Sequence, residues 1–153
     1  MEDKNMTTNK IKNFQLFKQQ KSDDCWIASC KMTIDYLNNT NYNYANLLKK
    51  AGTISTAKQG GYDGILELLH LAAPTLSYPG EIVIDKTIDD FKDLIIKNID
   101  NNRPVIVGLP GHAVVIIGYD SVRRVFITAA PYTGKENEIK YGSVITDICY
   151  SLK

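Results

Sequence analysis

The sequence predicts a single α+β domain, with helices in the first half of the chain and an antiparallel sheet in the second. Between residues 25 and 72, apolar residues recur every three or four positions, as on one face of a helix. After residue 105, β-branched and aromatic runs are bounded by Gly, Pro and Asp, as in strands joined by turns. Segregated helices and strands are typical of α+β folds, and 153 residues suffice for one core.

The chain is expected to begin with an arm, followed by a helix. Residues 1–13 are rich in Lys, Asn and Thr without an apolar period, which predicts a flexible N-terminal arm or a lead-in to a strand, so we place the domain at residues 14–153. An amphipathic helix is predicted over Cys25–Asn38, with Asp23 or Asp24 as its cap. Cys25 then lies in the first turn of this helix.

Two short helices should follow in the first half. One begins at Tyr44 and ends at Gly52, because glycine is favoured just past a helix end. After a loop at Gly60 and Gly61, the stripe Ile65–Ala72 predicts another helix that stops before Pro74.

The second half is expected to contain one helix and several strands. Glu81–Ile84 is a plausible strand, and Thr87 should cap a helix whose apolar face carries Phe91, Leu94, Ile95 and Ile99. Four further strands are predicted, over Val105–Leu109, Ala113–Tyr119, Arg124–Thr128 and Gly142–Ser151.

Composition excludes several classes of partner. With 18 basic and 17 acidic side chains, the net charge of +1 favours neither nucleic acid nor an anionic membrane. The longest apolar runs are far shorter than the ~20 residues of a membrane helix, and the polar start lacks the apolar stretch of a signal peptide. We expect a monomer that is cytoplasmic, or secreted without a visible signal peptide.

The cysteines point to thiol chemistry rather than to a scaffold. Three is an odd and small number for a secreted disulfide framework, so reduced thiols are expected. Only two histidines, His70 and His112, are present, and none is spaced with a cysteine as in a zinc site, so we predict no metal and no cofactor. Cys30 and Cys149 are expected to pack in the core, which is the usual place of a free cysteine.

Cys25 and His112 are the candidate nucleophile and base. A thiol attacks only as thiolate, and the start of a helix lowers the pKa of a cysteine. His112 follows Pro110 and Gly111 at the start of a predicted strand, where a turn could direct its ring across a cleft to take the thiol proton. His70 lies among leucines in a helix and is expected to be a partly buried structural histidine.

The segment around Cys25 resembles the active-site segment of papain-like cysteine peptidases. It reads Gln19-Gln20-Lys21-Ser22-Asp23-Asp24-Cys25-Trp26-Ile27-Ala28-Ser29. In that family a glutamine six positions before the nucleophile donates to the oxyanion, and a Cys-Trp pair opens the central helix. The resemblance therefore implies that Gln19 is the oxyanion donor, a type of group that lowers the barrier by ~3 kcal/mol.

The second half carries the same resemblance. Residues 103–109 and 111–120, which contain Gly-His followed by an apolar strand, look like the strand pair that presents the catalytic histidine. The spacing is similar to the compact bacterial branch, which includes single-domain effectors of plant pathogens and the leader-cleaving domains of bacteriocin exporters. Trp26 favours the effector-type branch, since leader-cleaving domains usually have glycine after the cysteine. The implied fold places the nucleophile on a central helix packed against a C-terminal antiparallel sheet.

One position departs from the family pattern. The Asn or Asp that orients the imidazole follows the histidine strand by a hairpin, and Ala130 stands there, before Pro131. Three explanations are open. A Cys-His dyad suffices, Thr128 or Asp120 substitutes, or the chain is a pseudoenzyme or an inactive form.

These residues predict a thiol-dependent peptidase that cleaves an amide bond in a peptide or protein. Two alternatives use the same site. Another acyl transfer would make the chain a deamidase, a transglutaminase-like enzyme or an amidase, because these reactions share the acyl-thioester intermediate. A catalytically impaired domain would instead hold a peptide in the same cleft.

Overall fold

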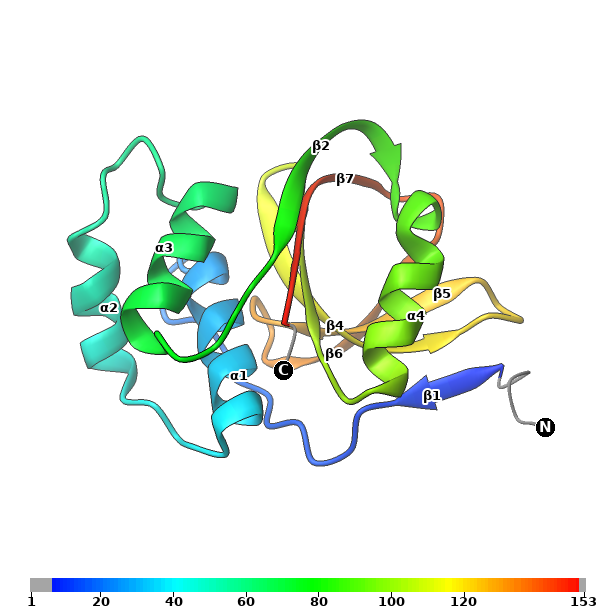
Figure 1. The fold of residues 1–153 in the computed structure, drawn as a ribbon, viewed down its shortest axis with the longest axis horizontal. Helices are drawn as coiled ribbons and strands as arrows, with labels where there is room; N and C mark the ends of the chain where they lie inside the picture. The colour runs from blue at the N-terminus through cyan, green and yellow to red at the C-terminus, as the bar shows by residue number, and fades with distance from the viewer. Residues whose placement is uncertain (1–6, 152–153) are drawn as a thin grey trace.

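The structure, a computed structural model, describes residues 7–151 and divides them between a helical side and a curled sheet (Figure 1). The helical side contains α1 (Cys25–Asn38), α2 (Tyr44–Gly52) and α3 (Tyr62–Ala72). Along the chain, the short 3-10 helix η2 (Ile88–Phe91) and α4 (Lys92–Asp100) follow the second strand and precede the third. The helices predicted at residues 25, 44 and 65 are confirmed, and α3 begins three residues earlier than its apolar stripe.

All strand pairs of the sheet are antiparallel, which confirms the α+β class. The strands are β1 (Thr8–Lys10), β2 (Gly80–Thr87), β3 (Val105–Leu109), β4 (His112–Asp120), β5 (Val125–Ala130), β6 (Lys135–Lys140) and β7 (Val144–Tyr150). Their order is β2-β7-β3-β4-β5-β6, and β1 pairs with the far end of β4, beyond β3. The last strand in sequence is therefore next to β3, which brings β7 close to the β3–β4 hairpin.

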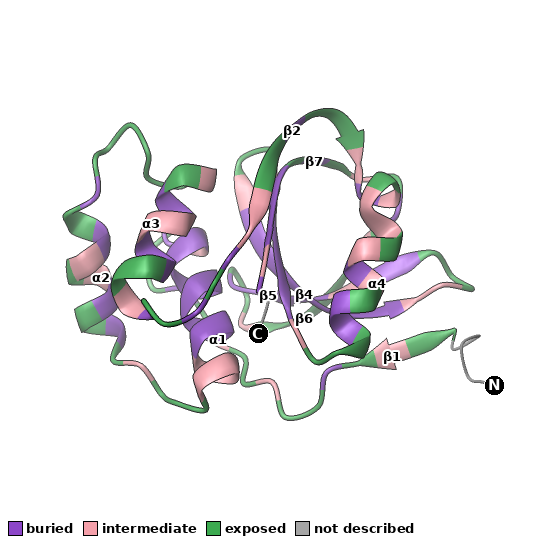
Figure 2. Cartoon of the chain, viewed as in Figure 1, coloured by how far each residue is buried: buried purple, intermediate pink, exposed green. Residues whose placement is uncertain are grey.

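Helix α1 is buried on every side rather than amphipathic as predicted. Residues Trp26–Ile34 are all buried, since α1 packs against α2 and α3 on one side and against β4 and β3 on the other (Figure 2). Even Lys31 is 5% exposed, and its ammonium donates to Asp35 at 2.8 Å and to the carbonyl of Tyr42 at 2.6 Å. A buried cation with these acceptors is paired and hydrogen-bonded, as burial of a charge requires.

The start of α1 differs from the expected cap. Asp24 occupies the N-cap position, but its side chain makes no capping hydrogen bond and instead accepts one from the Tyr44 hydroxyl at 3.4 Å. The first amides of α1, at Cys25 and Trp26, are therefore not engaged by the cap side chain. These orphan donors make the helix start available to an anion.

A two-residue turn positions the first residue of β4. Leu109 pairs with His112, and Pro110 and Gly111 lie between them. Gly111 has a φ of 72°, and proline followed by a residue with positive φ is the pattern of a type II turn. The sequence Pro-Gly thus determines where His112 enters the sheet.

Two strands were not predicted, and one of them lies within the segment predicted as an arm. Thr8–Lys10 form β1 and Ile11 is 2% exposed, so this part of the arm predicted at 1–13 belongs to the sheet, while residues 1–6 lie outside the described residues. Strand β6 has the sequence KENEIK and is mostly exposed at the sheet edge. An edge strand rich in charge avoids pairing with other chains but lacks the apolar alternation that predicts strands.

Candidate active site

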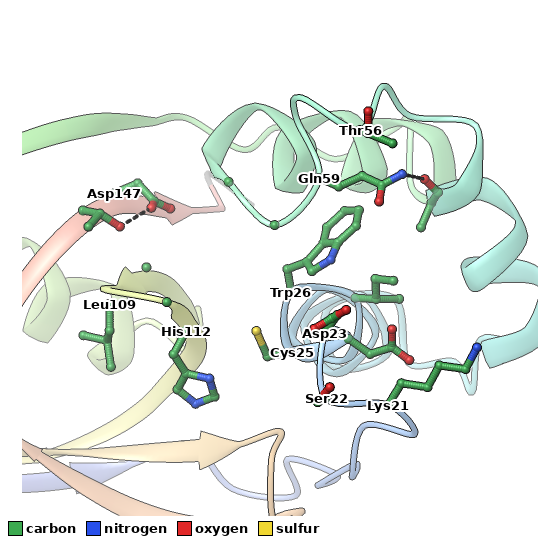
Figure 3. Close-up of a pocket in the computed structure, with 18 of the residues that line it drawn as sticks. Lys21, Ser22, Asp23, Cys25, Trp26, Thr56, Gln59, Leu109, His112 and Asp147 are labelled. Atoms are coloured by element: carbon green, nitrogen blue, oxygen red, sulfur yellow. Dashed lines mark hydrogen bonds between the residues drawn. The ribbon is translucent and has the colours of Figure 1, made fainter.

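A cleft of about 860 Å³ separates the helical side from the sheet. The start of α1 and the loop with Gln59, Gly60 and Gly61 form one wall, which we call the helix wall. The opposite wall, the sheet wall, consists of the β3–β4 hairpin and the part of β7 around Asp147. Cys25 and His112, the two residues predicted to react together, lie on these facing walls (Figure 3).

Cys25 is the first residue of α1, and its thiol is half-buried in the cleft. Burial raises the pKa of the Cys25 thiol, whereas hydrogen bonds from the backbone amides of Ala113, Trp26 and Cys25 itself lower it. Burial is the larger effect, so the structure differs from the expectation of a lowered pKa at a helix start. The amide of Ala113 belongs to the residue after His112, which brings the sulfur next to the start of β4.

His112 is partly buried at the rim of the cleft. Burial lowers the pKa of its imidazole below the ordinary value, which favours the neutral ring. In Figure 3 the His112 ring and the Cys25 sulfur line the same pocket, but the two side chains point in different directions. Among the hydrogen bonds of residues 7–151, none joins the ring to Cys25 or to another side chain. The ring thus shares the cleft with the thiol, and no side chain of the described residues orients it.

Gln19 lies close to the nucleophile in sequence, but its amide is occupied. Its Nε2 donates to the carbonyls of Lys21 at 2.8 Å and Ser22 at 3.0 Å, and the side chain is 6% exposed. The backbone amide of Gln19 donates to the carbonyl of Pro131 at 2.8 Å. This bond joins the segment before α1 to the end of β5, so the predicted oxyanion donor is tied to the sheet.

Ala130 occupies the place where an orienting residue would be expected. Ala129 pairs with Val115, so the register continues with Ala130 opposite Val114. Because side chains alternate between faces, Ala130 shares its face with His112 and is its diagonal neighbour, a relation that spans about 7–8 Å. A longer polar side chain could reach the ring from position 130, and the alanine methyl group cannot hydrogen-bond it.

Neither of the two possible substitutes for this residue lies beside His112 in the strand register. Thr128 pairs with Ile116, four residues along β4 from His112, which corresponds to ~14 Å. Asp120 ends β4 eight residues from His112, and its carboxylate accepts from the amides of Val122 and Arg123 in a turn. Strand register therefore keeps both side chains away from the imidazole.

The remaining cysteines and histidine lie outside the cleft. Cys30 is 0% and Cys149 1% exposed, in agreement with the predicted core positions. His70 is exposed rather than partly buried, and its ring meets the edge of Tyr78 with centroids 6.4 Å apart. Within residues 7–151, no group of three or more His, Cys, Asp or Glu could hold a metal ion. No helix of this part of the chain is long and apolar enough to cross a membrane.

Sequence reasoning missed one functional candidate, Asp147. This residue lines the cleft from β7, is 6% exposed, and its Oδ2 has no hydrogen-bond partner in the described part of the chain. The only signal in the sequence is a carboxylate in the middle of an otherwise apolar strand. Its place beside Gly108 results from the pairing of β7 with β3, which local patterns do not reveal.

Comparisons with known proteins identify the fold and the family of the chain. The fold is similar to the crystal structure of the peptidase domain of Streptococcus ComA, a bi-functional ABC transporter involved in a quorum sensing pathway. The TM-score is 0.62 at 20% identity, over 90% of this chain and 96% of that domain. No curated protein matches the chain. The Peptidase_C39 like family matches residues 11–150. With nearly the whole described chain matched, this protein belongs to the Peptidase_C39 like family and has the fold of a papain-like cysteine peptidase.

Proposed function

We propose that this protein is a thiol peptidase that cleaves an amide bond in a peptide or protein with Cys25 as nucleophile and His112 as base. The observation that carries the proposal is the position of both residues on facing walls of one cleft, with the Cys25 sulfur among the amides of Ala113 and Trp26. Membership of a peptidase family supports the same reaction class.

In the proposed reaction, His112 takes the thiol proton while the Cys25 sulfur bonds to the substrate carbonyl carbon. The negative carbonyl oxygen is stabilised by the Cys25 amide and by Gln19 Nε2. His112 then protonates the leaving amine, the C–N bond breaks, and an acyl-thioester remains on Cys25. Water, deprotonated by His112, attacks the thioester and releases the carboxylic acid and the free thiol.

Two features indicate that this machinery is not fully assembled without substrate. Gln19 must exchange one of its bonds to the carbonyls of Lys21 and Ser22 for a bond to the oxyanion. The His112 ring must turn toward the sulfur, with no partner from position 130 to guide it. Catalytic hydrogen bonds that tighten only with bound substrate are common, and they are consistent with slow turnover.

A second candidate function is peptide binding without turnover. The specific observation in its favour is Ala130, which leaves the imidazole without an orienting group. In this case the cleft would bind a peptide, and replacement of Cys25 would leave the biological activity unchanged.

The test combines thiol labelling with a digest of a peptide mixture. Iodoacetamide should alkylate Cys25 in the folded protein, with the buried Cys30 and Cys149 as internal controls. Mass spectrometry should detect new carboxyl ends with the wild-type protein and none with Cys25→Ala. Release of ammonia from glutamine without chain cleavage would support a deamidase. Cleavage by Cys25→Ala at the wild-type rate would refute the proposed nucleophile, and binding without cleavage by both proteins would support the second candidate.

A further inference from the structure

Asp147 is an acidic side chain at the end of the cleft that the proposed reaction does not use. It projects from β7 on the sheet wall, and in Figure 3 its carboxylate faces the space between the sheet and the Gln59 loop. The side chain is 94% buried, since its exposed fraction is 6%. Oδ1 accepts from the Thr146 hydroxyl at 2.8 Å, and Oδ2 has no hydrogen-bond partner among residues 7–151.

The surrounding backbone makes room for this carboxylate. Gly108 pairs with Asp147 across β3 and β7, and a side chain at position 108 would collide with the Asp147 carboxylate. Glycine at this position therefore permits an acid to line the cleft wall. An apolar residue at position 147 would close this end of the cleft at a lower cost in stability, because an unpaired buried carboxylate opposes folding.

No group within residues 7–151 compensates the Asp147 charge. Burial raises the pKa of Asp147, and the Thr146 hydrogen bond only partly opposes this. Tyr62 on α3 and Cys149 on β7 feel its charge, and both are neutral acids at pH 7. The charged side chains that line the same cleft are Lys21, Asp23 and Asp24, so acidic groups outnumber basic ones.

Asp147 is also unsuited to orient His112. Gly108 pairs with Ala113 on one side and with Asp147 on the other, so the Asp147 side chain shares the face of Ala113. His112 is the neighbour of Ala113 in β4 and points to the opposite face. Asp147 therefore does not replace the orienting residue that is absent at position 130.

We infer that Asp147 forms a specificity subsite that binds a basic side chain, lysine or arginine, of the peptide in the cleft. The ammonium or guanidinium group donates to the free oxygen of a carboxylate that Thr146 already holds from the other side. Rotation about the Cβ–Cγ bond, which is soft for aspartate, turns an oxygen toward the incoming cation. A charge-assisted hydrogen bond in a water-poor cleft favours the basic peptide by about tenfold or more.

The cleavage arm of the test rests on the proposed peptidase function. A synthetic peptide library, with each position varied among lysine, arginine, norleucine, glutamine and glutamate, is digested by the wild-type protein. One position relative to the cleaved bond should favour lysine or arginine by about tenfold over norleucine. Asp147→Asn should reduce this preference to less than twofold. Asp93→Asn, an equal change of charge at an exposed residue of α4 outside the cleft, should keep it.

A binding arm separates the inference from the proposed function. The Cys25→Ala protein, which cannot cleave, is titrated with fluorescent peptides of the same library, with and without Asp147→Asn. Tighter binding of basic peptides that disappears with Asp147→Asn supports the subsite even if the wild-type protein cleaves nothing. Equal preference with and without Asp147→Asn, or a preference for norleucine or glutamine in the wild-type cleft, overturns the inference while cleavage still supports the peptidase.

Discussion

The two walls of the cleft are built in different ways. The helix wall holds Cys25 with backbone groups, because the amides of Cys25 and Trp26 belong to the first turn of α1 and the segment before it carries Gln19 within six residues. The sheet wall depends on side chains brought together by strand pairing. Within the described residues, the His112 ring has no side-chain hydrogen-bond partner there and one oxygen of Asp147 is unpaired. Backbone amides thus partly offset the burial of the nucleophile, whereas no side chain of residues 7–151 hydrogen-bonds the imidazole of the base.

The largest effect is expected on the sheet wall, at the base. His112→Ala should lower kcat/KM by ~10³-fold, since general acid-base catalysis contributes 10²–10⁴-fold. Peptide cleavage measured side by side with His70→Ala checks this. His70 is exposed on α3 away from the cleft, so its replacement should leave the rate within twofold. An equal loss of kcat/KM in both variants would mean that His112→Ala lowers the rate by destabilising the protein and not by removing a base.

On the helix wall, Gln19→Ala should reduce kcat by ~10²-fold with little change in KM, because an oxyanion donor acts mainly in the transition state. Gln20→Ala is the matched control, since Gln20 is the exposed neighbour of the buried Gln19. A rise in KM with an unchanged kcat would instead show that Gln19 acts by stabilising the loop at Lys21 and Ser22.

A carboxylate at position 130 of the sheet wall should increase the rate of peptide cleavage. Ala130→Asp places a carboxylate on the face of His112 and should raise kcat by about tenfold through orientation of the imidazole. Ala130→Ser, whose hydroxyl is too short to bridge the diagonal, should give no gain. If Ala130→Asp folds with an unchanged melting temperature and an unchanged rate, orientation of the ring does not limit turnover.

The opposite pKa shifts of Cys25 and His112 predict that kcat/KM is constant over a broad pH range. Burial lowers the pKa of His112 and raises the pKa of Cys25, so the pair holds one proton over a wide range. kcat/KM should fall tenfold per pH unit only below the lowered pKa of the imidazole and above the raised pKa of the thiol. A narrow profile, in which the acidic and basic limbs lie close together, would show that the two pKa values are not shifted apart.

The smallest effect concerns stability. A buried acid with a raised pKa binds more protons in the folded state than in the unfolded state, so stability falls as pH rises from about 3.9 through the folded pKa. Asp147→Asn removes this loss and should raise Tm by about 2–4 °C at pH 7, with a smaller difference at pH 4. Calorimetry at both pH values checks this. A lower Tm at pH 7 would show that the carboxylate stabilises the fold.

Local patterns predicted the helix wall better than the sheet wall. The bounds of α1 follow from its apolar period and from the Asn-rich segment after it, and the Pro-Gly turn located His112 at the start of β4. The sequence did not reveal that α1 is buried on all sides, because the elements that cover it lie far along the chain. The sequence also did not show how far Thr128 and Asp120 lie from His112, since that distance depends on strand register.

There are also physical reasons why the sequence did not predict β1, β6 and the role of Asp147. Strand β6 contains a single apolar residue, Ile139, and its backbone pairing with β5 defines it more than its side chains do. Strand β1 has three residues, too few for any periodicity, and exists because the far end of β4 extends beyond β3. Asp147 could be noticed as a lone acid in an apolar strand, but its role depends on Gly108, 39 positions earlier in the chain.

The burial of α1 determines where this protein can be re-engineered. Nine consecutive residues after Cys25 are buried and only Trp26 and Ile27 among them line the cleft, so most substitutions there change packing before they change substrate preference. Libraries for altered selectivity should instead vary Leu109, Thr146 and Asp147 on the sheet wall together with Thr56 and Gln59 on the facing loop. Directed evolution restricted to these positions would sample new substrates while the helix that carries the nucleophile keeps its sequence.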